Sequence, residues 1–455
     1  MLTACSPESR TRSQIAGVPM HSHQPAPKAR QVAAAVVGNV LEWYDFIVFG
    51  LLTVVIARLF FPTSSQYASL LLTTATFGVG FFMRPVGGLL LGIYADRKGR
   101  KASLLLIIGL MTVAMGMIAF APPYAAIGIA APLIILLARL LQGFATGGEF
   151  SCATTFLVEI APPHRRCFYG SWQMFGLGMA VLTGTLLGAL VTRGLTPEAL
   201  DSWGWRIPFL FGLVIGPVGL YIRRHLDETL DFVSMRTAPT ESHAFGSTLA
   251  AHFKEMVVCL GLSGGPSIQY YLLLVYMPTF ANTQLHLPLS AALIAQSVGL
   301  VFLVLLVLLF GALADRVGRK PIMIGAFVLY LGLAYPLFSW VHQSPSLGHL
   351  MTMQIVLCSL LGAFYGPFAT VLVEQFPTRI RSTGLAIPYN LGVMLFGGFA
   401  QFFVTWLIHV TGSPIAPAFY MMFGAAIALV SLLFITDPAR EPRGQLAVSA
   451  PEPVV

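Results

Sequence analysis

Charged side chains are scarce in this chain. Asp, Glu, Lys and Arg make up only 10% of the 455 residues, and 56% of the residues are hydrophobic. A soluble domain carries about 25% charged residues. Apolar stretches of about 20 residues, long enough to cross a bilayer, recur along almost the whole sequence. This composition leaves no room for a large soluble domain and indicates an integral membrane protein.

Cysteine is sparse as well. The five cysteines are an odd number, lie far apart and form no CxxC pair: Cys5, Cys152, Cys167, Cys259 and Cys358. This pattern favours neither a disulfide framework nor a metal site. The sequence also has no phosphate-binding loop and no constellation around a nucleophile. We therefore expect a protein that is not an enzyme and that needs no cofactor or metal.

The apolar segments predict an all-α membrane protein with twelve transmembrane helices. The expected spans lie near 32–58, 67–94, 102–120, 128–158, 168–192, 206–222, 251–280, 289–314, 321–341, 349–372, 383–408 and 416–436. Residues 1–31 lack the apolar core of a signal peptide, so we expect a disordered cytosolic tail. Whether Met1 or Met20 is the true start stays open.

The positive charge predicts the orientation. An even number of spans places both ends of the chain on one side, and most of the 26 Lys and Arg residues fall in the tails and loops of that side. Because positively charged loops stay in the cytoplasm, we expect both termini to be cytoplasmic. The net charge of +8 is then spread over one membrane face, which argues against a nucleic-acid partner.

Two different signatures occur twice. GIYADRKGRK (92–101) returns as GALADRVGRK (311–320), and LVEIAPPHRR (157–166) returns as LVEQFPTRIR (372–381) at nearly the same offset. The shared offset predicts two pseudo-symmetric six-helix bundles, residues 32–222 and 251–436. A cytoplasmic loop, 223–250, would join them, and 437–455 would form a second cytosolic tail. Parallel halves of this kind are a transporter architecture.

These repeats, together with RLLQG (139–143), resemble the major facilitator superfamily over residues 32–436. Further motifs are similar to its metabolite:proton symporters: GNVLEWYDF (38–46), FFMRPVGG (81–88), LLQGFATGGE (140–149), WGWRIPF (203–209) and RRHLDET (223–229). The resemblance implies the major facilitator fold, a multi-pass position in a bacterial inner membrane and a functional monomer. It also implies that a proton gradient supplies the energy.

The leading functional prediction is a secondary active transporter that imports an organic acid by proton symport with alternating access. Citrate or a related tri- or dicarboxylate is the expected substrate, because the tail after residue 436 is short and Pro-rich, whereas carriers of compatible solutes often have an extended helical tail. A symporter for a zwitterion such as proline or betaine is the nearest alternative. A metabolite sensor without transport is an alternative of another class. Sodium coupling also stays open.

Five ionisable residues lie within the predicted spans: Glu42, Asp45, Arg84, Arg139 and Glu149. A charge at the centre of a bilayer costs about 2.5–3.5 kcal/mol on insertion scales, so such residues usually mark function. We expect Glu42, Asp45 or Glu149 to carry the coupled proton, because carboxylates can take up and release one. A fixed ion pair of Glu42 with Arg139 that only locks helix packing is the alternative.

Arg84 and Arg139 are the expected ligands of a substrate carboxylate, since a guanidinium offers a planar fork for bidentate contact. Asn39 shares a polar stripe with the acids of the first span, and Gln142 shares one with Arg139. The second half supplies Gln269, Tyr270 and Asn390 as further substrate contacts. Aromatic residues on long helices more often serve packing, so we favour the two amides.

The repeated signatures also predict a cytoplasmic gate. Its expected members are Asp96, Arg97 and Arg100 in one half, Asp315, Arg316 and Arg319 in the other, and Glu159 and Glu374 at the ends of the fourth and tenth helices. The resemblance implies that this network steadies the state closed to the cytoplasm. Positive loops that only set the topology are the alternative.

Overall fold

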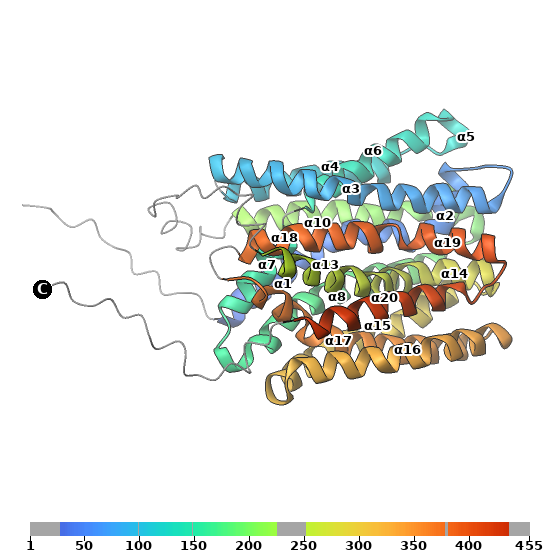
Figure 1. The fold of residues 1–455 in the computed structure, drawn as a ribbon. Coiled ribbons are helices and arrows are strands. Elements are labelled where there is room, and N and C mark those ends of the chain that lie inside the picture. The colour runs from blue at the N-terminus through green and yellow to red at the C-terminus, as the bar shows by residue number, and fades with distance from the viewer. Residues whose placement is uncertain (1–27, 99, 148, 225–251, 378–380, 436–455) are drawn as a thin grey trace, which may run out of the picture.

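The computed structural model describes residues 28–98, 100–147, 149–224, 252–377 and 381–435, and these residues form a bundle of long helices (Figure 1). The first half contains α1 (Lys28–Leu51), α2 (Thr53–Phe60), α3 (Gln66–Lys98), α4 (Arg100–Ala119), α5 (Tyr124–Ile127), α6 (Ala130–Ala145), α7 (Glu149–Glu159), α8 (Arg166–Gly194), α9 (Pro197–Ser202) and α10 (Ile207–Arg224). The second contains α13 (Phe253–Tyr271), η3 (Leu272–Tyr276), α14 (Met277–Gln284), α15 (Leu289–Val317), α16 (Arg319–Gln343), α17 (Leu347–Glu374), α18 (Arg381–Gly392), η4 (Val393–Gly398), α19 (Ala400–Thr411) and α20 (Ala416–Leu433).

The described helices account for the predicted spans. Eight helical segments are long and apolar enough to cross a membrane, and α1 with α2 forms one further span that is bent by 63°. Three shorter apolar helices supply the remaining crossings: Leu105–Ala119, Ala130–Ala145 and Gly204–Val214. Within the described residues the architecture is therefore the twelve-helix arrangement that the sequence predicts.

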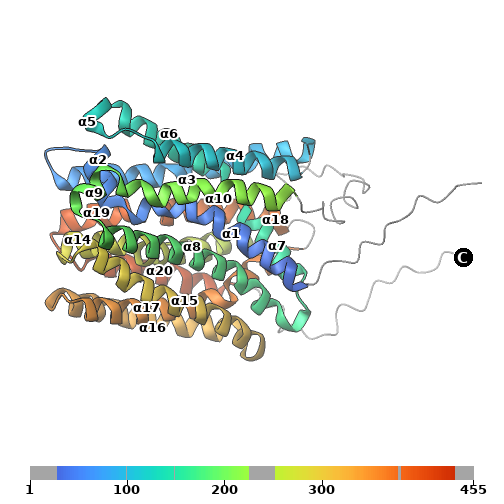
Figure 2. The ribbon, with the colours of Figure 1, turned by 180° about the vertical axis from the view of Figure 1, so that it is seen from behind.

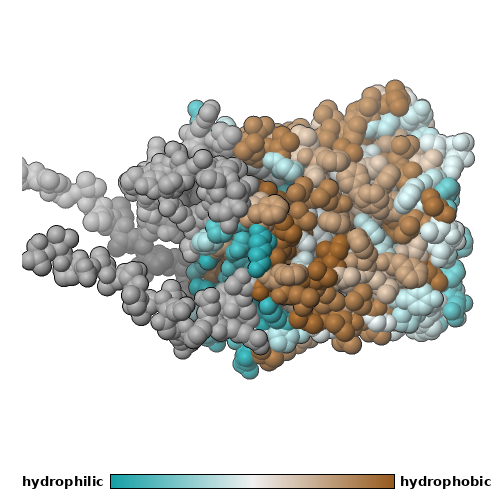
Figure 3. Space-filling model, in the orientation of Figure 1, coloured by the Kyte–Doolittle hydropathy of each residue, from teal (hydrophilic) through white to brown (hydrophobic). Residues whose placement is uncertain are grey.

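The surface of the bundle is suited to lipid. Figure 3 shows a broad apolar region over the middle of the molecule and more hydrophilic residues towards its two ends. Leu89, Leu190 and Leu433 are each at least 63% exposed on this surface. Exposed leucines in such number contact hydrocarbon without cost, and helices satisfy their own backbone groups there.

Both ends of the described chain lie at the same end of the bundle. α1 begins there and α20 ends there, and the junctions of α3 with α4 and of α15 with α16 lie beside them (Figures 1 and 2). We call this the gate end, because the repeated signature 92–101 and 311–320 lies at those junctions. The predicted tails and the loop 223–250 fall almost wholly outside the described residues.

Besides the bent first span, three spans that were expected to be continuous helices are interrupted. The expected helix 128–158 ends at Ala145 and resumes at Glu149, because the TGG stretch between them consists of weak helix formers. The seventh and eleventh spans contain π-helical turns, η3 and η4. In η3 the carbonyls of Leu273 and Leu274 accept hydrogen bonds from the side chains of Gln354 and Gln296. Such turns frequently occur at functional sites.

Close approach between helices depends on glycine. α3 lies against α6, and a Cβ on Gly143 of α6 would sit 1.7 Å from the carbonyl oxygen of Gly80. Between the halves, α8 lies along α15, where a Cβ on Gly311 would sit 2.6 Å from the Ser171 hydroxyl. Small residues at these crossings let the backbones touch, as is common in membrane helix pairs.

We expect Gly143→Ala to lower the midpoint of thermal unfolding in detergent, because the new methyl group meets backbone that cannot yield. Overpacking of this kind costs about 1–3 kcal/mol. Gly109→Ala in α4 is the matched control, since a Cβ at that position would have no neighbouring atom within 4 Å. Equal midpoints for the two variants would contradict this account of the α3–α6 crossing.

Candidate functional site

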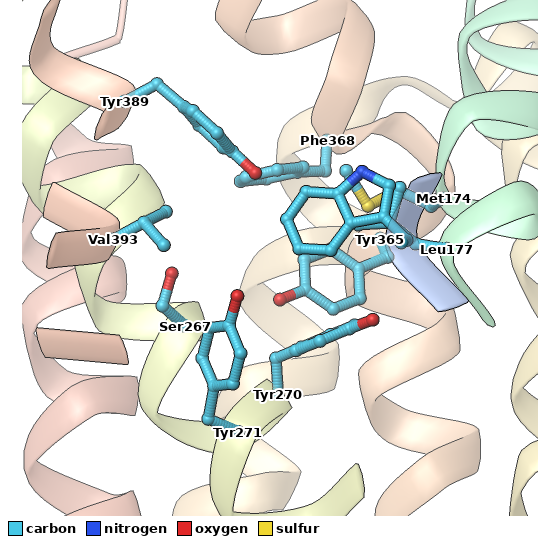
Figure 4. A pocket seen from close by; sticks show the side chains of 10 residues that line it. Met174, Leu177, Ser267, Tyr270, Tyr271, Tyr365, Phe368, Tyr389 and Val393 are labelled. Carbon is cyan, nitrogen blue, oxygen red and sulfur yellow. The ribbon is translucent and has the colours of Figure 1, made fainter. Parts of the chain in front are cut away.

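A small cavity lies between the two halves of the bundle. Ten residues line it: Trp43, Met174, Leu177, Ser267, Tyr270, Tyr271, Tyr365, Phe368, Tyr389 and Val393. Figure 4 shows the hydroxyl groups of Ser267, Tyr271 and Tyr389 directed into the open space. Its volume of about 20 Å³ suffices for a water molecule, whereas ligand pockets measure about 300–1,000 Å³. The halves must therefore separate before an organic substrate can enter.

Arg84 of α3 lies behind the aromatic wall of the cavity. It is fully buried, and its guanidinium carbon is 4.8 Å from the ring centroid of Trp43 and 4.9 Å from that of Phe81. Its Nε donates a hydrogen bond to the Thr146 hydroxyl at 3.2 Å. Nη1 has no hydrogen-bond partner among the described residues. A buried donor of this kind is available for a ligand carboxylate.

Arg139 of α6 is held differently. Nη1 donates to the Phe46 carbonyl at 3.0 Å and to the Gln142 side chain at 2.7 Å, and Nη2 donates to the Phe77 carbonyl at 3.4 Å. The guanidinium also lies over the Phe46 ring, 4.3 Å from its centroid. It thus connects α6 with α1 and α3. Substrate contact by Arg139 and Gln142 stays a prediction, and this geometry favours a positioning role for both.

The two acids of α1 face different surroundings. Glu42 and Asp45 are both buried. The Asp45 carboxylate lies against α10, because a Cβ on Gly212 would sit 2.5 Å from its Oδ1. Neither acid is among the residues that line the cavity. Which of them carries the coupled proton stays a prediction, and the side chain of Glu149 lies outside the described part of the structure.

The amides that the sequence favours as substrate ligands bind backbone instead in this state. Asn39 donates to the Gln173 carbonyl at 3.0 Å, Gln269 to the Met421 carbonyl at 2.6 Å and Asn390 to the Gly147 carbonyl at 2.8 Å. Each bond joins two different spans. Their substrate contacts stay predictions that require these bonds to break.

Aromatic residues, rather than these amides, line the cavity. Tyr270, which the sequence ranks below the amides, is one of four lining tyrosines. Its hydroxyl has no hydrogen-bond partner among the described residues. Trp43 and Tyr365 are absent from the predicted site. The available signal was helical spacing, since Ser267, Tyr270 and Tyr271 share one face of α13.

Ion pairs and a helix cap close the gate end across the two halves. Glu374, at the end of α17, accepts hydrogen bonds from Arg319 and, at 3.2 Å, from Arg166 of the first half. The Asp315 carboxylate accepts the backbone N–H groups of Cys167 and Phe168 at 2.9 Å each. A carboxylate at the first turn of α8 is favourable because it satisfies unpaired N–H groups and complements the helix dipole.

Arg381 of α18 completes the contacts between the halves by donating to Glu159 at 3.0 Å. Arg316 is exposed, and the side chains of the other predicted members lie outside the described part: Asp96, Arg97 and Arg100. Arg166 and Arg381 are gate residues that the sequence did not predict. Their role follows from which loops meet at the gate end, and a single sequence does not show that.

The profile of the Major Facilitator Superfamily matches residues 36–387 and 267–454. A citrate-proton symporter of Klebsiella pneumoniae is 35% identical over 398 residues, 88% of this chain and 89% of that relative. A glycine betaine/proline/ectoine/pipecolic acid transporter of Dickeya dadantii is 33% identical over 428 residues, 91% of this chain and 84% of that relative. A solved D-xylose-proton symporter has the same fold, with a TM-score of 0.71 at 17% identity, over 90% of this chain and 97% of that one.

Two bundles around a central cavity are a transporter architecture, and the family match together with these relatives identifies the protein as a membrane transporter. The chain belongs to the major facilitator superfamily. The resemblance seen in the sequence is therefore confirmed, and so is the predicted fold.

We expect Arg139→Lys to lower the thermal midpoint, because lysine cannot reach the two carbonyls and Gln142 together. Each buried acceptor left without a partner costs about 1–3 kcal/mol. The measurement is thermal unfolding in detergent together with substrate binding to the folded fraction. Unchanged stability with lost binding would instead make Arg139 a direct ligand.

We expect Glu374→Gln to open the gate end, because it weakens the pairs with Arg319 and Arg166. Cys167 is a native reporter, since its thiol is buried between the halves. Labelling by a maleimide, followed at the Cys167 peptide by mass spectrometry, should become several-fold faster.

Asp201→Asn is the control for this measurement, because the Arg58–Asp201 pair joins α2 and α9 of the first half, which lie away from the gate end (Figure 2). Its labelling rate should match that of the unaltered protein. If Glu374→Gln also labels at that rate, the ion pairs do not hold the halves together.

Proposed function

We propose that the protein is a proton-coupled symporter of the bacterial inner membrane that imports a small organic acid, of which citrate is the first candidate. The observation that carries the proposal is the buried Arg84, whose Nη1 is free to bind a carboxylate beside a cavity between two halves. The relative from Klebsiella pneumoniae supports both the proton and the acid. We expect the functional unit to be a monomer.

The described state is closed at the gate end and has room for water only. In alternating access, separation of the halves at the opposite end would admit the acid to Arg84 and a proton to a carboxylate. Neutralising Glu42 with a proton would offset the extra negative charge that the acid brings into the bundle. The halves would then rock, part at the gate end and release both. A proton gradient would drive this cycle without a cofactor.

A zwitterionic compatible solute is the second candidate. The cavity wall consists largely of aromatic rings, and the faces of Tyr and Trp attract ammonium groups. A single guanidinium nitrogen without a partner among the described residues matches the one carboxylate of such a solute better than the three of citrate. The transporter of Dickeya dadantii supports this reading.

Uptake of labelled citrate, proline and glycine betaine into proteoliposomes decides between the candidates. We expect one of the three compounds to accumulate, and only under an imposed inward proton gradient. In a separate assay, tags on both termini should be accessible only from the inside of the cell. Accumulation driven by a sodium gradient alone would overturn proton coupling. Saturable binding of all three without uptake would favour the sensor.

We expect Glu42→Gln to abolish gradient-driven accumulation while exchange of internal for external substrate continues, because exchange needs no net proton movement. Asp45→Asn is the matched variant on the same helix, and we expect it to retain accumulation because Asp45 faces α10. Retained accumulation in Glu42→Gln would remove Glu42 from the coupling mechanism, and loss in Asp45→Asn alone would place the proton there.

A further inference from the structure

The break in the fourth span is bound by the other half of the protein. Asn390 of α18 donates a hydrogen bond to the Gly147 carbonyl at 2.8 Å, although the two residues are 243 positions apart. Its second bond goes to the Ala386 carbonyl of its own helix, at 2.9 Å. The interruption of the helix leaves a carbonyl available, and Asn390 binds it.

The break must also contain glycine at this point. A Cβ on Gly147 would sit 2.0 Å from the Arg84 carbonyl oxygen and 2.5 Å from the Gly88 nitrogen of α3. The backbone of the break therefore lies directly on α3, next to Arg84 behind the aromatic wall of the cavity. Its position is fixed from one side by α3 and from the other by α18.

A stacked pair of rings lies next to this hydrogen bond. Phe150 of α7 and Tyr389 of α18 are parallel within 1°, with centroids 3.7 Å apart. Tyr389 also lines the cavity (Figure 4). Both residues lie about 12–14 Å from the gate-end termini of their helices, at 1.5 Å per residue. The pair thus separates the cavity from the ion pairs at the gate end.

We propose that these four residues, Gly147, Phe150, Tyr389 and Asn390, form an inner gate that opens when Arg84 binds a substrate carboxylate. The link is Thr146, which accepts the Nε hydrogen bond of Arg84 and directly precedes Gly147. A carboxylate that draws the guanidinium towards the cavity takes this bond from Thr146. The break then loses its tie to Arg84, and the Gly147 carbonyl moves away from Asn390. This second step rests on the proposed function.

The test measures how far apart the halves stand at the gate end. Spin labels are placed at His164 and Pro377, which are exposed residues of opposite halves, after replacement of the native cysteines. Without substrate, Asn390→Ala and Phe150→Leu should each raise the ratio of open to closed distances about three- to tenfold, as loss of one buried contact predicts. Phe150→Leu keeps an apolar side chain and removes only the stacked ring, so we expect this variant to fold.

Phe82→Ala is the matched control. It removes another aromatic contact between the halves, with Phe399 at 5.3 Å, from a surface-exposed position. It should leave the ratio within about twofold of the unaltered protein, the change that a near-neutral surface contact produces. If Asn390→Ala and Phe150→Leu change the ratio no more than Phe82→Ala does, the inner gate does not exist.

The substrate arm adds citrate or glycine betaine to the same labelled protein. Whichever compound binds should raise the open fraction, and Thr146→Val should abolish that rise while binding persists. Suppose that Asn390→Ala and Phe150→Leu raise the open fraction, but that the substrate also raises it in Thr146→Val. The inner gate is then supported, and its proposed link to Arg84 through Thr146 is wrong. If neither compound binds at all, the proposed substrates fail while the substrate-free result still decides the gate.

Discussion

The structure depends on keeping two guanidinium groups inside a bundle that faces lipid. Arg84 and Arg139 are fully buried, and each lies over aromatic rings that offset part of the loss of hydration. Arg139 donates from Nη1 and Nη2 to backbone carbonyls of neighbouring helices, and its Nε has no partner among the described residues. Arg84 keeps one donor without a partner among the described residues. An unpaired terminal nitrogen beside the cavity-lining Trp43 makes Arg84 the candidate ligand, whereas both terminal nitrogens of Arg139 are bound to neighbouring helices.

The need to pair buried polar groups also explains how the interruptions of the helices are stabilised. Interrupted helices expose carbonyls, and two of the described interruptions are met by side chains: Gln296 and Gln354 at η3, and Asn390 at the break before α7. In a medium without water such partners are needed, because an unpaired carbonyl is costly. These side-chain bonds stabilise only the closed arrangement of the helices, because they break when the helices move apart. Groups that stabilise the closed state are therefore the groups that must change partners during transport.

The two ends of the interface use different chemistry. The gate end joins the halves with Glu374, Glu159 and Asp315, whose partners are arginines and a helix N-terminus in the other half. At the opposite end one contact between the described parts of the halves is aromatic, with Tyr67 stacked on His409 at a centroid distance of 3.8 Å. Charge pairs near the membrane surface can exchange with water as they part. This suits a gate that must open and close repeatedly.

Composition and repeats determined the class of the molecule, because the hydrocarbon core accepts only long apolar helices and the duplicated signature reveals two equivalent halves. Glu159, Asp315, Arg319 and Glu374 were also predictable, since charges at helix ends meet where the loops converge. Only the tertiary structure assigned Asn390 to a backbone carbonyl, Asp45 to α10 and the tyrosines to the cavity. Helical periodicity shows which residues share a face, but the neighbour that this face meets is set by bends and breaks, which arise from packing between distant segments.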